Sequence, residues 1–249
     1  MAPLTVMGER VWRLALQDKT IRSLSVLVGS TTLAQLLSLL AAPVLTRLYT
    51  PSEFGVLAVY GATLSILTGV AALRYDLAIT LPRSQRAAAS LVILSTAAVL
   101  ANAVVLGIVL LLDKGILASL GIPTLESYWY FLPLGLCGAG LYSTLSYWAI
   151  RQKAFGAIAR TQLSRTGASI LTQVSLGVAG AGPIGLLSGQ LIAQSAGIGT
   201  LSRSFLGKEV LRGTSMATIL ASAKRYIRFP LVSSWGSFLN SAGLYLPAI

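Results

Sequence analysis

Long apolar stretches without a charged residue alternate along the chain with short segments that carry most of its charges. Such stretches are typical of membrane-spanning helices, because about 20 apolar residues in a helix cross the hydrocarbon core of a bilayer. Five charge-free windows each have the length of one span: residues 23–46, 54–73, 87–112, 127–150 and 229–249. A Thr50-Pro51-Ser52-Glu53 capping box predicts the start of the second helix.

The longest charge-free run, residues 166–202, would form a helix of about 55 Å, which is too long for one span. Its Gly- and Pro-rich stretch at residues 177–185 predicts a hairpin of two helices. Since two spans need more residues than the run offers, we expect the fifth helix to begin before Thr166. The pattern therefore predicts an all-α polytopic membrane protein with a six-helix N-terminal lobe and the start of a seventh transmembrane helix.

The basic residues predict the orientation of these helices. Of the 19 Lys and Arg residues, 17 fall before the first span or in the second, fourth and sixth loops, whereas only Arg47 and Lys114 fall on the other side. Because cytoplasmic loops are enriched in basic residues, the N-terminus is predicted to be cytoplasmic. The formal net charge of +12 is then explained by topology, and no nucleic-acid partner is expected.

The composition agrees with a membrane protein and argues against most enzymes. Hydrophobic residues make up 55% and charged residues 10%, whereas a soluble domain is usually about 25% charged. The chain has no His, and its one cysteine, Cys137, can form neither an intrachain disulfide nor a Cys-based metal site. No catalytic constellation or nucleotide-binding loop is apparent, so we expect no enzyme activity, cofactor or metal.

These features divide the chain into four predicted parts. Residues 1–22 are expected to form a cytoplasmic N-terminal segment, and residues 23–203 the six-helix lobe. Residues 204–224, the longest polar stretch, are expected to be a cytoplasmic connector. Residues 225–249 are expected to be the first helix of a truncated second lobe, since this helix has a basic inner flank and no outer flank.

Polar side chains inside the apolar helices are the candidates for function. The amides among them include Gln35, Asn102 and Gln173. Each amide has two interpretations, a hydrogen bond between packed helices or a place in the wall of a polar cavity.

Arg74 and Asp76 carry charges where the second span ends and the sequence remains apolar. Ionisable groups at membrane depth usually face the interior of a helix bundle, although an arginine at a helix end can also extend to the lipid headgroups. On one continuous helix the two side chains would point about 200° apart. Asp76 is therefore expected to form a structural ion pair with another helix rather than with Arg74.

Several segments resemble one known family when taken together and in order. Residues 74–82 (RYDLAITLP), residues 147–159 (YWAIRQKAFGAIA), the Gln173, Gly185 and Gln194 region, and Phe229-Pro230 resemble bacterial polysaccharide (O-antigen type) flippases. This family belongs to the multidrug/oligosaccharidyl-lipid/polysaccharide exporter superfamily. The chain departs from it in two ways: the family continues through about six more helices, and it often has Glu at the position of Asp76.

The resemblance implies two six-helix lobes around a central cavity that moves substrate by alternating access. The implied substrate is an undecaprenyl-pyrophosphate-linked oligosaccharide, moved across the bacterial plasma membrane. Arg74 would bind the pyrophosphate with help from Arg165 and Arg160. Gln35, Gln173 and Asn102 would contact the sugar. The implied partners are membrane lipids, a polysaccharide polymerase and a chain-length regulator.

Two other functions remain open from the sequence. A cation-coupled multidrug exporter of the same superfamily would need carboxylates within its spans, and none lies in the middle of a complete span here. A membrane-embedded polysaccharide polymerase or ligase would need a large external catalytic loop, whereas the longest external loop here has about 14 residues.

Overall fold

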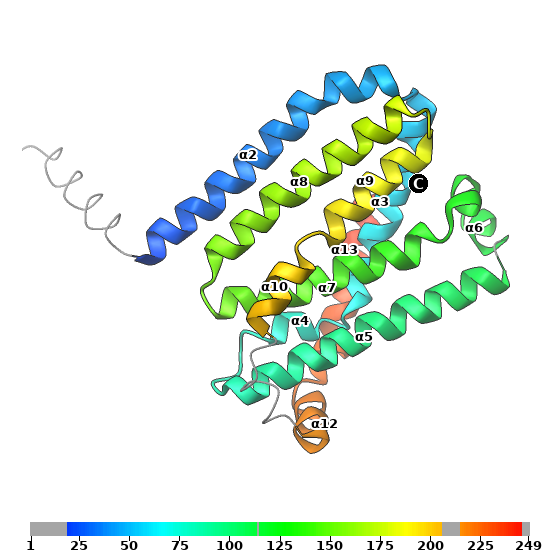
Figure 1. Cartoon of the computed structure of the whole chain (residues 1–249). Coiled ribbons are helices and arrows are strands. Elements are labelled where there is room, and N and C mark those ends of the chain that lie inside the picture. The colour runs from blue at the N-terminus through cyan, green and yellow to red at the C-terminus, as the bar shows by residue number, and fades with distance from the viewer. Residues whose placement is uncertain (1–18, 114, 206–214, 246–249) are drawn as a thin grey trace, which may run out of the picture.

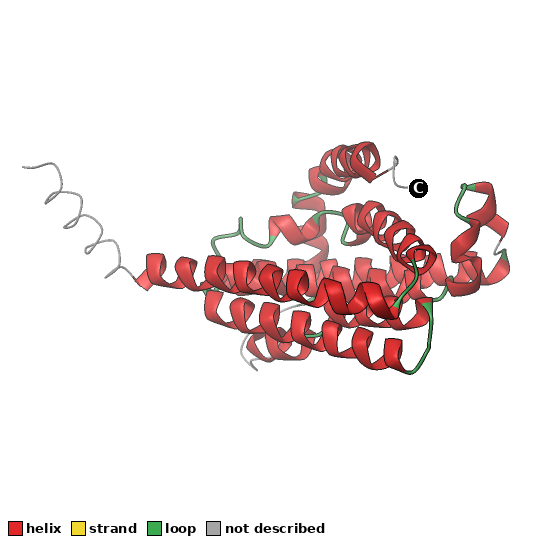
Figure 2. Cartoon of the chain, turned by 90° about the horizontal axis from the view of Figure 1, so that it is seen from above, coloured by secondary structure: helices red, strands yellow, loops and turns green. Residues whose placement is uncertain are grey.

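The computed structural model describes residues 19–113, 115–205 and 215–245. Within these ranges the chain forms helices joined by short turns and contains no strand (Figure 2). The structure therefore confirms an all-α protein.

Five helices are long, and shorter helices connect or extend them. The long ones are α2 (Lys19–Leu48), α3 (Pro51–Ala71), α5 (Gln85–Leu112), α7 (Phe131–Arg151) and α8 (Phe155–Val178). The shorter ones are α4 (Tyr75–Ala78), α6 (Gly115–Ser119), the 3-10 helix η1 (Pro123–Tyr128), α9 (Pro183–Ser195), α10 (Ile198–Phe205), α12 (Met216–Arg225), the π-helix η2 (Phe229–Ser233) and α13 (Ser234–Tyr245).

Three helices are long and apolar enough to cross a membrane by themselves, in the segments Ser25–Leu48, Pro51–Ala71 and Gln85–Leu112. They correspond to the first three predicted spans. The fourth and fifth predicted spans correspond to α7 and α8, which have 21 and 24 residues and hence the length needed to cross. The chain is an all-α membrane protein.

The helices pack side by side in an order that differs from their order in the sequence (Figure 1). Helix α2 lies along α8, α8 packs on α9, α9 on α7, and α7 on α5, while α3 contacts α7 and α9 and carries α13 on its other side. We call the end of the bundle where α4, α10 and α12 lie the α4 end. We call the opposite end, where α6 and η1 lie, the α6 end.

Local sequence signals explain most helix boundaries. The Thr50 hydroxyl accepts a hydrogen bond from the Glu53 N–H, and the Glu53 carboxylate accepts one from the Thr50 N–H at 2.6 Å, so the predicted capping box is present. The predicted hairpin is also present, because α8 ends at Val178 and α9 begins at Pro183. Helix α8 begins at Phe155, before Thr166 as expected.

The sixth span is broken, which the sequence pattern did not predict. Helix α9 ends at Ser195 and α10 begins at Ile198, and Gly197 between them has a φ of +100°. Glycine tolerates this left-handed conformation, so it permits the break.

The second helix also ends differently from the prediction. Helix α3 stops at Ala71, and Leu73 and Arg74 follow with φ values of 49° and 58° before α4 begins at Tyr75. Arg74 therefore lies in a turn and not on a continuous apolar helix, and the 200° separation expected between Arg74 and Asp76 is wrong. Left-handed φ values are uncommon for residues other than glycine and cost about 1–3 kcal/mol each, so the surrounding packing must hold this turn.

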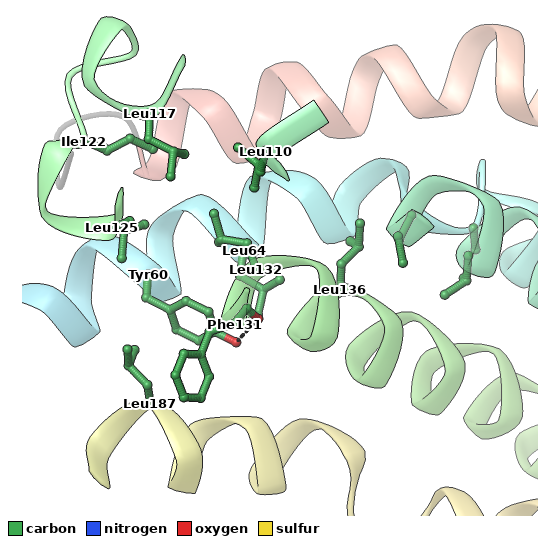
Figure 3. Packing of buried hydrophobic residues seen from close by; sticks show 14 residues of the cluster. Tyr60, Leu64, Leu110, Leu117, Ile122, Leu125, Phe131, Leu132, Leu136 and Leu187 are labelled. Atoms are coloured by element: carbon green, nitrogen blue, oxygen red, sulfur yellow. Dashed lines mark hydrogen bonds between the residues drawn. The ribbon is translucent and has the colours of Figure 1, made fainter. Parts of the chain in front are cut away.

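Three clusters of buried side chains hold the bundle together; the smallest joins α2 to α9, and the two larger ones lie toward the two ends. One lies toward the α6 end, where Tyr60 of α3 packs against Phe131 and Leu132 of α7 and Leu187 of α9 (Figure 3). The Tyr60 hydroxyl donates a hydrogen bond to the Phe131 carbonyl at 3.2 Å. The other cluster lies at the α4 end around Trp148, which is fully buried.

Three of the four predicted parts of the chain, residues 1–22, 204–224 and 225–249, lie partly outside the described residues. Of the N-terminal segment 1–22 only the start of α2 is described, and of the connector 204–224 the described part contains nearly all of α12. The predicted helix at 225–249 is described to Tyr245 as η2 and α13, and it packs along α3. The division into lobes and connector stays a prediction.

Candidate functional site

The turn after α3 places Arg74 in a small polar cavity of about 310 Å³. The cavity is bounded by the last two turns of α3, by α4 and by α7. Its polar lining comes from Ser65, Thr68, Arg74, Asp76 and Ser143. The Nε atom of Arg74 is buried and has no hydrogen-bond partner among the described residues. Since buried polar groups are almost always paired, this unpaired N–H could be satisfied by a ligand or water that a small movement of the side chain brings within reach.

Asp76 lines the same cavity, and a serine of another helix holds its carboxylate. Its Oδ2 atom accepts a hydrogen bond from the Ser143 hydroxyl at 3.0 Å, and its Oδ1 atom accepts one from the Leu77 N–H at 3.0 Å. The side chain is only 6% exposed. No ion pair of Asp76 is found among the described residues, so the partner that α7 supplies is a neutral hydroxyl instead of the expected cation.

Arg165 lies in a neighbouring cavity, of about 380 Å³, lined by α7 and α8. Its guanidinium carbon lies 3.7 Å from the centre of the Tyr142 ring, and its Nε–H donates to the carbonyl of Ala193 in the last turn of α9. The carbonyls at a helix C-terminus lack partners within the helix and favour a cation. Arg165 thus pairs with a carbonyl at the end of α9, next to the break. Its place in the cavity wall would also put it near an anion that entered the cavity.

The two cavities adjoin each other along one face of α7, since Ala139 and Ser143 line both of them. Ser146 and Tyr147 continue the same face toward Arg165. The Ser146 hydroxyl oxygen is buried without a partner among the described residues. Together these residues form what we call the α7 groove: the lining of both cavities, with Arg74 and Asp76 in one and Arg165 in the other.

Two of the predicted sugar-binding amides bond to neighbouring helices. The Asn102 Nδ2 atom of α5 donates to the Ala71 carbonyl at the end of α3 at 3.0 Å. Gln173 of α8 is buried, and its Nε2 atom donates to the Leu186 carbonyl of α9 at 3.5 Å. In this structure both amides take the first of the two interpretations left open by the sequence, a bond between packed helices.

The remaining predicted site residues lie away from the α7 groove. Arg160 is exposed and lines a cavity between α8 and α2, whose other walls include Ser30 and Leu33. Gln35 is exposed on α2 and lines neither cavity of the groove. The structure therefore brings Arg74, Asp76 and Arg165 together and does not bring Arg160 and Gln35 to them.

Sequence reasoning missed the residues of α7 that complete the groove. Ala139, Ser143, Ser146 and Ile150 are separated by four, three and four positions, which is the spacing of one helix face. The sequence did contain a signal for these residues, because a helix face with small and hydroxyl-bearing side chains stands out in an otherwise apolar span. Arg151 was missed as well. Its guanidinium donates to three carbonyls of the α4–α5 turn, those of Ile79, Thr80 and Ser84, at 3.3–3.4 Å.

The described residues contain no group of three or more His, Cys, Asp or Glu side chains able to hold a metal ion. The groove therefore offers guanidinium groups, one carboxylate and several hydroxyls. These groups are suited to binding an anionic, hydroxyl-rich molecule.

Comparison with known proteins gave one match. Searches of curated proteins and of solved structures found no match to the chain. A family model described as polysaccharide biosynthesis protein matches residues 44–212, which include α3 to α10 and hence the whole α7 groove. Because this match covers more than half of the chain, the protein belongs to the polysaccharide biosynthesis protein family.

Proposed function

We propose that the chain is part of a flippase that moves an undecaprenyl-pyrophosphate-linked oligosaccharide across the bacterial plasma membrane by alternating access. The family membership supports a role in polysaccharide biosynthesis or transport. The proposal assigns transport and not catalysis to this chain. Its substrate has three chemically different parts, an anionic pyrophosphate, a sugar rich in hydroxyls and a long apolar tail.

One observation carries the proposal: the turn at Leu73–Arg74 separates a polar cavity from an apolar one. Arg74 lines the polar cavity beside α7, whereas Leu73 lines an apolar cavity of about 330 Å³ between α3 and the η2–α13 segment. Pro230 and Trp235 form part of that apolar wall, and Trp235 is 65% exposed. Two adjacent residues thus present a cation and an apolar side chain to different spaces, an arrangement that fits a molecule with an anionic head and an apolar tail.

The polar side of this turn offers suitable chemistry for the head. A guanidinium binds phosphate oxygens through two parallel N–H groups, which an ammonium cannot reproduce. Arg74 has an unpaired Nε–H with which to do so. The Ser146 hydroxyl has no partner among the described residues and can donate to a sugar or phosphate oxygen. The Ser65 and Thr68 hydroxyls donate to backbone carbonyls, so their oxygens can accept from sugar hydroxyls. The apolar cavity would leave the tail next to the lipid.

The proposal is tested by changing Arg74 in the native gene at its chromosomal position. We expect Arg74→Ala to reduce surface glycan strongly, since a charge-assisted contact contributes about 1.5–3 kcal/mol, or roughly a 10- to 100-fold change in affinity. Arg74→Lys keeps the charge and loses the planar fork, so its reduction should be smaller. Membrane abundance of each variant is measured in parallel by immunoblotting.

Arg203→Ala is the matched control. It removes one exposed cation from the α4 end without touching any wall of the α7 groove. We expect this variant to keep wild-type glycan. If Arg74→Ala is present in the membrane and also keeps wild-type glycan, the assignment of Arg74 to the pyrophosphate is wrong.

A further inference from the structure

Another cavity lies at the α4 end of the bundle. It is larger than the two cavities of the α7 groove and shares no lining residue with them. It has a volume of about 630 Å³ and is lined by the α4–α5 turn, the start of α5 and α12. Three arginines line it: Arg83 and Arg86 from the turn and the start of α5, and Arg225 from the end of α12. No acidic residue lines it. It therefore carries more arginines than any cavity of the α7 groove.

Fixed contacts position the elements that carry these arginines. Arg151 of α7 holds the α4–α5 turn through its bonds to three carbonyls there. On the other side, the Tyr75 hydroxyl of α4 donates to the Ala223 carbonyl of α12 at 3.5 Å. Tyr226 and Phe229, which follow α12, pack against the buried cluster around Trp148. The cavity is therefore built by the packing of the bundle.

The electrostatics of the surrounding structure favour an anion in this cavity. Ser84 caps the 28-residue helix α5 and lines the cavity, so the positive end of this helix dipole adds to the three guanidinium groups. Three of the four described acidic residues, Glu53, Asp113 and Glu126, lie at the α6 end. The fourth, Asp76, is bonded within the α7 groove. No described carboxylate therefore neutralises the arginines.

Helix α12 presents different chemistry on its two faces. Thr218, Ser222 and Arg225 line the cavity, whereas Met216 and Leu220 point away from it and are 79% and 61% exposed. A helix with one polar, basic face and exposed apolar side chains on the other is suited to lie in the plane of the membrane interface. Exposed Lys224 flanks the apolar side chains and could extend to the headgroups. In that orientation the arginine cavity would lie at the depth of the lipid headgroups.

We infer that this cavity binds the phosphate headgroup of an anionic membrane phospholipid. The three guanidinium groups would bind the phosphate oxygens, and the exposed apolar face of α12 would lie beside the acyl chains. The bound lipid would hold α12 against the start of α5. The site is separate from the α7 groove, so it does not depend on the proposed transport function.

The inference is tested by native mass spectrometry of the purified chain in a non-ionic detergent, titrated with phosphatidylglycerol. Arg83→Gln, Arg86→Gln and Arg225→Gln are combined in one variant. Because a basic residue near a membrane surface contributes about fivefold in affinity to an anionic lipid, we expect the loss of three such residues to weaken binding roughly a hundredfold. Circular dichroism and gel filtration check that it folds.

The control variant combines Lys153→Gln, Arg203→Gln and Arg228→Gln, three exposed cations of the α4 end outside the cavity. It should retain binding to within a few fold, and wild-type protein should bind phosphatidylcholine much more weakly than phosphatidylglycerol. Equal losses in both triple variants would overturn the inference, because they would show a general effect of charge.

Two further binding experiments distinguish this site from the α7 groove. Arg74→Ala should still bind phosphatidylglycerol, which makes a failure of this inference distinguishable from a failure of the transport proposal. Undecaprenyl pyrophosphate, titrated against the same variants, should not depend on the three cavity arginines. If it depends on them while phosphatidylglycerol does not, the cavity is a substrate subsite and the phospholipid assignment is wrong.

Discussion

At the scale of single residues, Gly185 shows how closely the helices of the hairpin approach the α2–α3 turn. A Cβ atom at position 185 would lie 2.2 Å from the Tyr49 hydroxyl oxygen. That hydroxyl donates to the Gln173 carbonyl at 2.6 Å, and burial and the nearby Glu53 carboxylate raise the pKa of Tyr49, which keeps the phenol protonated. We expect Gly185→Ala to lower the free energy of unfolding by about 1–3 kcal/mol, as overpacking usually does.

Thermal unfolding in detergent, followed by circular dichroism, measures this effect. Gly29→Ala is the control, because a Cβ atom there meets nothing within 4 Å and alanine favours a helix. It should leave the midpoint unchanged or raise it. Tyr49→Phe removes the clashing oxygen, so Gly185→Ala should cost less in that background. An equal cost in both backgrounds would contradict the steric explanation.

At the scale of elements, Arg165 pairs with α9 just before the break between α9 and α10. Its guanidinium stacks on Tyr142 of α7 and donates to Ala193 of α9, so it joins three helices. Lysine cannot stack a planar group while donating from the same position. We expect Arg165→Lys to lower the free energy of unfolding by about 1–2 kcal/mol, from the loss of the cation–π contact and of one hydrogen bond.

Arg74→Lys is the comparison for this prediction, measured by the same thermal unfolding. The Arg74 Nε–H has no partner among the described residues, so this change should leave the unfolding midpoint near that of the wild type. Arg165 would then combine a structural role with its place in the groove. If Arg165→Lys unfolds at the wild-type midpoint, the end of α9 does not depend on the guanidinium.

The elements also show what a sequence can and cannot predict here. Charge-free length predicted the five long helices, and the Thr50 capping box and the Gly-rich hairpin predicted helix boundaries, because these signals are local. The turn at Leu73–Arg74 carries no glycine, and the residues that flank it, Ala72 and Tyr75, are buried against residues distant in the sequence. The same limit applies to the site. Asn102 and Gln173 could not be assigned to a bond or to a cavity until their neighbours were known.

At the scale of the whole molecule, charge is distributed between the two ends of the bundle. The described acidic residues apart from Asp76 lie at the α6 end, while the cavity arginines and Arg151 lie at the α4 end. A potential that is negative inside the cell and anionic lipids of the inner leaflet both favour the basic end on the cytoplasmic side. The turn at Arg74 would then face the leaflet in which the proposed substrate is made.

We predict this orientation for single cysteines introduced into a Cys137→Ser background. In spheroplasts, a membrane-impermeant maleimide should label Thr124→Cys at the α6 end and Ala179→Cys at the end of α8. Lys153→Cys, in the turn between α7 and α8, should be labelled only after permeabilisation. All three positions are exposed, so access depends on the side of the membrane and not on burial. Labelling of Lys153→Cys in intact spheroplasts would place the α4 end outside. The cavity that contains Arg74 would then lie near the outer leaflet, whereas the proposed substrate is made at the inner one. Both the predicted topology and the transport proposal would be wrong.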